Sequence, residues 1–150
     1  MDFDSQICTS RSQSERLLAL GLKKETADCQ HCAYTKDSKG NQIPKRNQKW
    51  FTRIGTEESV QVCGFMDATF IPAWSLHRLI EMMPNRFRVC DRFAFLIVSN
   101  EKVQHYLYDV EYDDLEGVCH WGSGNIYDNI IDCIRWLIGA GYFNKEYLEE

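Results

Sequence analysis

The chain has 150 residues, of which 44% are hydrophobic, 26% are charged and 13% are aromatic. This composition is typical of an ordinary globular domain and excludes a disordered or fibrous chain. The formal net charge of −5 argues against general binding to nucleic acids or anionic membranes, but it allows a local basic surface.

The first residues contain two acids and no apolar segment of the kind that a secretion signal needs. No stretch reaches the roughly 18 apolar residues of a membrane span. We therefore expect a cytoplasmic protein without a membrane segment. In that reducing compartment the seven cysteines should be free thiols, because disulfide scaffolds belong to oxidising compartments.

The first helix is expected to begin near Ser12. Ser12 and Glu15 have the S-x-x-E spacing of a capping box, in which each side chain pairs with a backbone N–H at the helix start. Gly21 is the usual left-handed terminator, and apolar Leu22 follows it. Residues 24–28 should form a further helical turn.

Between about residues 30 and 50 apolar side chains are scarce and turn-forming residues are frequent. This pattern predicts a long polar loop or a loose hairpin. The segment is also the most basic of the chain, with a net charge of +5 over residues 30–53. Its charged residues are Lys36, Asp37, Lys39, Lys45, Arg46, Lys49 and Arg53.

Strand signals resume over residues 60–71, and Pro72 is expected to end that strand. Ser75 is a suitable N-cap for a second helix over residues 75–83, which Pro84 stops. The spacing of leucine, isoleucine and methionine in this segment is that of one helix face.

Alternation over residues 87–97 predicts one strand with an irregularity near Asp91. A turn at 99–102 and a second alternating run over 103–112 complete a β-hairpin. The acidic residues between 109 and 116 lack the D-x-[DN]-x-[DN]-G pattern of a calcium loop. We expect them to form a solvated strand end and turn.

The clearest helix covers residues 125–138, with Ile130 and Ile134 in its apolar stripe and a terminator at Gly139 or Gly141. The glycine-rich turn before it could bind an anion, but a plain N-cap at its end accounts for the same residues.

Three helices separated by strand runs indicate an α+β fold. We expect a single domain over residues 1–150, built on a small, mainly antiparallel sheet packed by two or three helices. The helices at 75–83 and 125–138 should cover the inner face of that sheet. The helix at 125–138 should contribute most to the core.

Cys29 and Cys32 form a C-x-x-C motif, which is a candidate for a zinc site. Zinc takes four ligands, usually from two such pairs, and the chain has no second pair. Cys63, Cys119 and His120 could complete a site only if folding brought them together. We favour two incidental thiols and expect no cofactor.

Motifs of nucleophilic catalysis are absent, because the sequence has neither G-x-S-x-G nor a cysteine-enzyme signature. His77 is expected on a helix and His105 on a strand, both as surface or boundary residues. We therefore expect no enzymatic activity.

The basic segment is followed by two aromatic residues, Trp50 and Phe51. Cations beside aromatic rings can hold phosphates and stack bases. The candidate ligand-binding residues are Lys45, Arg46, Lys49, Trp50, Arg53 and Trp74. The alternative, a solvated loop with Trp50 in the core, stays open at this point.

Several blocks of sequence, in the same order along most of the chain, resemble small uncharacterised proteins carried by phages and integrated elements of gut bacteria. The blocks are SERLLALGL at 14–22, ETAD at 25–28, FIPAWSL at 70–76, LIEMMP at 79–84 and the closing segment 129–142. The resemblance implies an origin on a mobile element and carries no activity with it.

The sequence leaves three functions open. The first is a non-enzymatic accessory protein of a phage or mobile element that binds a host or phage macromolecule, in the first instance a protein. This hypothesis rests on the contrast in charge between the basic segment and residues 101–150, which contain 11 acids and 3 bases. Oppositely charged surfaces speed the encounter with a partner and fix its orientation.

The second function is a protein that sequesters a nucleotide signal of host immunity, and the third is a nucleic-acid binder. Both would use the same basic segment, and a homodimer is compatible with any of them. A pocket lined by tryptophan and arginine would favour sequestration. A flat basic surface would favour a macromolecule.

Overall fold

The computed structural model describes residues 6–55, 67–90, 92–99, 102–109, 114–121 and 125–150. Its α-helices are α1 (Arg11–Ala19), α2 (Leu76–Met82) and α3 (Ile126–Ala140), with short 3-10 turns at Lys24–Thr26, Lys45–Asn47 and Lys145–Tyr147. The strands are β1 (Cys29–Tyr34), β2 (Trp50–Ile54), β3 (Ala68–Ala73), β4 (Arg86–Val89), β5 (Arg92–Ser99), β6 (Lys102–Asp109) and β7 (Asp114–Trp121).

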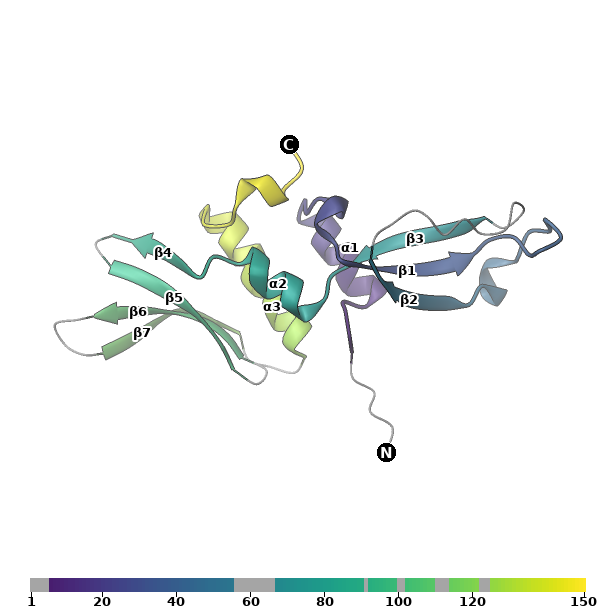
Figure 1. Cartoon of the computed structure of the whole chain (residues 1–150). Helices are drawn as coiled ribbons and strands as arrows, with labels where there is room; N and C mark the ends of the chain where they lie inside the picture. The colour runs from purple at the N-terminus through teal and green to yellow at the C-terminus, as the bar shows by residue number, and fades with distance from the viewer. Residues whose placement is uncertain (1–5, 56–66, 91, 100–101, 110–113, 122–124) are drawn as a thin grey trace, which may run out of the picture.

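The strands form two antiparallel sheets, one in the order β2-β1-β3 and the other in the order β4-β5-β6-β7. The helices lie between the two sheets (Figure 1). The α+β class and the antiparallel pairing are therefore confirmed. The expectation of one sheet is wrong, because β1, β2 and β3 form a sheet of their own.

Helix α3 is the main element of the core, as expected. It packs against β6 and β7 of the four-stranded sheet and also contacts α1 and α2. The N-cap of this helix is Asn125, whose side chain accepts a hydrogen bond from the Tyr127 N–H at 2.7 Å. The helix ends at Gly141, which has a left-handed backbone conformation. The inward stripe includes Ile130, Ile134 and Leu137, none of which is exposed to solvent.

Helix α1 begins two residues earlier than the sequence suggested. Ser10 is the N-cap: its hydroxyl accepts from the Gln13 N–H, and the Gln13 side chain accepts from the Ser10 N–H. The expected capping box at Ser12 and Glu15 is wrong, because both residues already lie inside the helix. Gly21 does end the segment in the left-handed region, with φ of 89°.

Residues 29–34 are a central strand and not the start of a loop. Five of the six side chains of β1 are buried, although Gln30 and His31 are polar. Because β2 and β3 flank this strand on both sides, its backbone groups are paired and its polar side chains are covered. The loop of the hairpin is thus confined to residues 35–49.

Pro72 lies inside β3 and does not end it, contrary to expectation. Proline lacks a ladder N–H, which a central strand would need. Since β3 is the outer strand of its sheet, Pro72 needs no partner beyond it and sits opposite Gln30.

One further expectation is corrected in the four-stranded sheet. The run over residues 87–97 is two strands, β4 and β5, with Val89 opposite Arg92, and the chain turns after β4 at Cys90, whose φ is 53°. The alternation continues across this short turn, so the pattern did not reveal it. The acidic segment was expected to form a strand end and a turn: Asp109 is the last residue of β6 and Asp114 the first of β7, while residues 110–113 lie outside the described residues.

The three-stranded sheet is joined to the helices by hydrogen bonds around Thr9, which is fully buried. The Thr9 N–H donates to the Trp74 carbonyl at 2.9 Å, and the Trp74 N–H donates to the Thr9 hydroxyl at 3.0 Å. The Thr9 carbonyl accepts from Nε2 of His31 at 2.7 Å. Nearby, the Asp28 carboxylate accepts from the backbone N–H and the hydroxyl of Ser75, the N-cap of α2.

The buried stripe of α3 leads to a stability prediction. Replacing Ile130 or Ile134 with alanine should lower the free energy of unfolding by about 2–5 kcal/mol, because buried methyl groups are lost and a cavity is left. Urea unfolding followed by circular dichroism measures the effect. Ile54→Ala is the control, since Ile54 is 81% exposed and its loss should cost about 0.5 kcal/mol or less. Unchanged urea midpoints for both buried variants would refute this assignment of the core.

Candidate functional site

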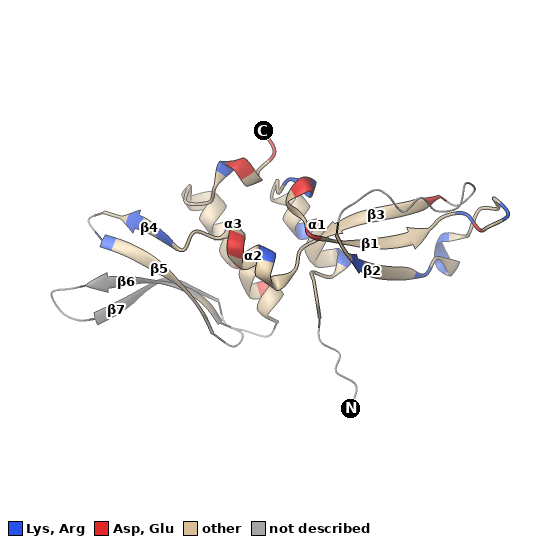
Figure 2. Ribbon diagram, viewed as in Figure 1, with Lys and Arg blue, Asp and Glu red and all other residues tan. Residues whose placement is uncertain are grey.

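Several lysine and arginine residues lie at the end of the three-stranded sheet that is farthest from the helices (Figure 2). We call the exposed residues Lys39, Lys45, Arg46 and Lys49 the basic tip. Lys36, at the base of this tip, is paired instead with Asp67 at 2.7 Å. Three of the sequence candidates, Lys45, Arg46 and Lys49, are therefore brought together.

Local hydrogen bonds shape the loop that carries the basic tip. The Asp37 carboxylate accepts from the backbone N–H groups of Lys39 at 2.9 Å and Asn41 at 2.8 Å. These hydrogen bonds lower the pKa of Asp37 below its usual value, and the bond from the Asn41 N–H makes the largest contribution. Within the loop, the Ile43 N–H donates to the Thr35 carbonyl at 2.8 Å, and Lys36 and Gln42 form an isolated β-bridge, so the chain after β1 pairs with the loop itself.

The two aromatic candidates, Trp50 and Trp74, differ in their exposure to solvent. The guanidinium of Arg11 lies 4.6 Å from the ring centre of Trp50, which is half-buried. Trp74 is fully buried in the core, where its indole N–H donates to the hydroxyl of Thr26 at 2.9 Å. Trp74 is thus a structural residue, and its proposed stacking on a ligand is not compatible with its position.

Strand alternation divides the remaining candidates between the two faces of β2. Trp50 and Thr52 share a face with His31, whose Nδ1 lies 2.9 Å from the Thr52 hydroxyl. Arg53 falls on the opposite face, at the position paired with Gln30. A single ligand on the sheet would therefore not meet Trp50 and Arg53 together.

The face that carries Arg53 also carries three aromatic rings. The sequence pointed to Phe51 beside the basic segment, but it did not connect Tyr34 or Phe70 with a site. We call Tyr34, Phe51 and Phe70 the aromatic face. Phe51 and Phe70 both lie opposite Cys32, one on each neighbouring strand, and the Tyr34 and Phe51 ring centres are 5.7 Å apart. Phe51 is 39% exposed and Phe70 38%, so these rings have a free surface.

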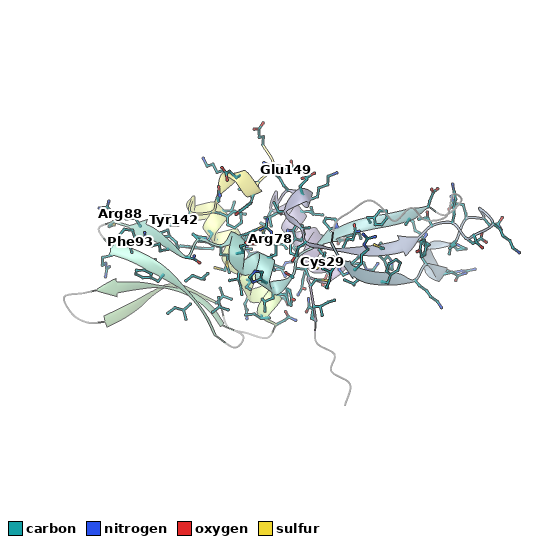
Figure 3. All side chains as sticks on the ribbon, viewed as in Figure 1. Cys29, Arg78, Arg88, Phe93, Tyr142 and Glu149 are labelled. Carbon is teal, nitrogen blue, oxygen red and sulfur yellow. The ribbon has the colours of Figure 1, made fainter. Side chains whose placement is uncertain are left out.

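The four-stranded sheet offers a second exposed apolar strip, for comparison. Phe93, Phe95 and Ile97 alternate along β5, with exposed fractions of 46%, 41% and 39%. Arg88 lies near Phe93 at the far side of the molecule (Figure 3). The basic tip is at the other end of the molecule, and the cations beside this strip are arginines (Figure 2). The guanidinium of Arg86 lies 5.5 Å from the ring centre of Phe93.

The structure does not bring the two motif cysteines together. Cys29 and Cys32 are three positions apart on one strand, so their side chains leave opposite faces of the sheet. Cys63 lies outside the described residues, and Cys119 and His120 belong to β7. Over the part of the chain that the structure describes, no group of three or more metal-ligating residues occurs.

Burial controls the chemistry of these thiols. Burial, and next the charge of Asp28, raise the pKa of Cys29 to about 12. Burial also raises the pKa of Cys32, although the charge of Arg53 acts in the opposite direction. Both thiols therefore stay protonated at neutral pH, and a protonated thiol is neither a nucleophile nor a good metal ligand.

No family model, curated protein or solved structure matches this chain. Within the described ranges, no helix has the length and apolar character needed to cross a membrane.

The different burial of the cysteines predicts their reactivity. Cys90 is exposed and should be alkylated by iodoacetamide at pH 7.5, whereas Cys29 and Cys32 should react far more slowly because they are buried and protonated. Timed labelling followed by peptide mass spectrometry resolves each site. Labelling in urea is the control, in which all three should react. Labelling of Cys32 as fast as Cys90 in the folded protein would contradict this prediction.

Proposed function

We propose that this protein is a non-enzymatic binding protein of a phage or mobile element, which holds an acidic host or phage macromolecule at its basic tip. The observation that carries the proposal is the exposure of Lys39, Lys45, Arg46 and Lys49 on one projecting hairpin. Exposed cations clustered on one surface attract an acidic partner and orient it during encounter.

The shape of this region supports a macromolecule over a sequestered nucleotide. A nucleotide trap of the expected kind would place cations and a tryptophan ring around one pocket. Here Trp74 belongs to the core, and Arg11 already lies against the ring of Trp50. The cations project from the sheet end, where a large partner can reach them.

The charge distribution predicts how binding depends on salt. The whole chain has a net charge of −5, so attraction of an acidic partner depends on local clusters of cations such as the basic tip. Binding through exposed cations is screened by salt, with a Debye length of about 10 Å at 0.1 M. We therefore expect an interaction that weakens as salt rises.

Paired lysine variants test the role of the basic tip. Wild-type protein should be retained on immobilised heparin at low salt, and the variant carrying Lys45→Ala and Lys49→Ala should elute at a clearly lower salt concentration. The matched control carries Lys24→Ala and Lys145→Ala, two exposed lysines outside the tip, and has the same change in net charge. No retention of the wild type, or an equal loss in the control, would overturn the proposal.

Native mass spectrometry of freshly purified protein tests the rival function. The proposal predicts that no small ligand of a few hundred daltons accompanies the protein. A co-purifying nucleotide that is lost on Arg46→Ala and Lys49→Ala would replace macromolecule binding with sequestration.

A further inference from the structure

We infer that the acidic macromolecule is a single-stranded nucleic acid, whose bases stack on the aromatic face while its phosphates contact the basic tip. This inference rests on the proposed function and names the chemistry of the partner. Single-strand binding surfaces combine a path of cations with aromatic rings on which bases stack. The three-stranded sheet has both features side by side.

The order of residues along the sheet gives the surface a direction. Moving outward from the helices along this face, the first row contains the buried Gln30, the next contains Phe51 and Phe70, and the last contains Tyr34. The loop that follows Tyr34 carries the basic tip. A strand of nucleic acid laid along this face would meet the rings first and the cations at the end of the hairpin.

The spacing of the rings suits separate bases. Phe51 and Phe70 stand on the two outer strands of the sheet, with β1 between them. Adjacent strands are about 4.8 Å apart, so these two positions are separated by roughly 10 Å. That distance exceeds the separation of bases in one continuous stack. The two rings would therefore receive different bases, as on a sheet that spreads a single strand across its surface.

An independent observation on the same face points to a ligand. Gln30 is only 6% exposed, and its Nε2 group finds no acceptor among the residues that the structure describes. Strand alternation places this amide on the face of Tyr34 and next to the row of Phe51 and Phe70. A buried donor without a partner costs free energy. Because the Nε2 atom is itself shielded from solvent, the Gln30 side chain would have to turn outward before a base carbonyl or a phosphate oxygen could accept from it.

Other acidic partners use less of this surface. A duplex keeps its bases stacked and paired, so it offers them no contact with the rings. An acidic protein surface would satisfy the lysines but needs none of the three aromatic side chains. A single-stranded partner uses the cations, the rings and the unpartnered amide together.

Fluorescence anisotropy with a labelled 12-nucleotide oligothymidine tests the inference. Phe51→Leu combined with Phe70→Leu removes both rings but keeps apolar side chains of similar size, so the fold should be retained. Binding should weaken roughly 5- to 100-fold for each stacking ring lost. The matched control carries Phe93→Leu and Phe95→Leu, two phenylalanines of similar exposure on the other sheet, and should bind like the wild type.

Comparison with heparin separates this inference from the proposed function. The ring variant should keep its retention on heparin, because the basic tip is intact, and should lose its preference for the oligothymidine over a duplex of the same length. Equal oligothymidine affinity of the wild type and the ring variant would overturn the inference, while salt-sensitive heparin binding through Lys45 and Lys49 would still support the proposed function. Recovery of an acidic protein partner, with no oligothymidine binding, would overturn it in the same way.

Discussion

The structure depends on the buried hydrogen bonds that Thr9 makes between three segments distant in sequence. Its backbone pairs with Trp74 at the end of β3, and its carbonyl accepts from His31 at the centre of β1. Its hydroxyl lies 2.8 Å from that of Ser14 in α1. Because all these groups are shielded from water, the loss of any one partner would leave a buried polar atom unsatisfied. The three-stranded sheet is therefore held in one orientation against the helices.

This junction determines where the candidate binding surface can be. The face of the sheet with His31 and Trp50 is occupied near the helices by Thr9 and Arg11. The opposite face carries the exposed rings of Phe51 and Phe70. One face thus serves the attachment of the sheet, and the other keeps its rings exposed, with the basic tip held away from the helices (Figure 1).

The α-helices followed closely from local patterns. Helix α3 has a long apolar stripe, and the caps at Asn125 and Ser75 use side chains that bond to the N–H groups of the first turn. The hairpin of β5 and β6 followed from alternation on both sides of a turn. The strand β1 could not be recognised in this way, since its polar residues are buried by partners that lie 20 to 40 positions further along the chain.

The sequence by itself determined the α+β class, the core helix α3 and the basic character of residues 30–53, because each depends on residues close together in the chain. Only the tertiary structure decided which aromatic side chains are buried: Trp74 lies in the core, and Phe70 lies on the exposed aromatic face. The reason is that strand register, and not composition, selects which face a side chain occupies, and a shift of one residue would exchange the two faces. The separation of Cys29 from Cys32 has the same origin. In a loop, two cysteines at this spacing could bind one metal ion, but on a strand their side chains lie on opposite faces of the sheet.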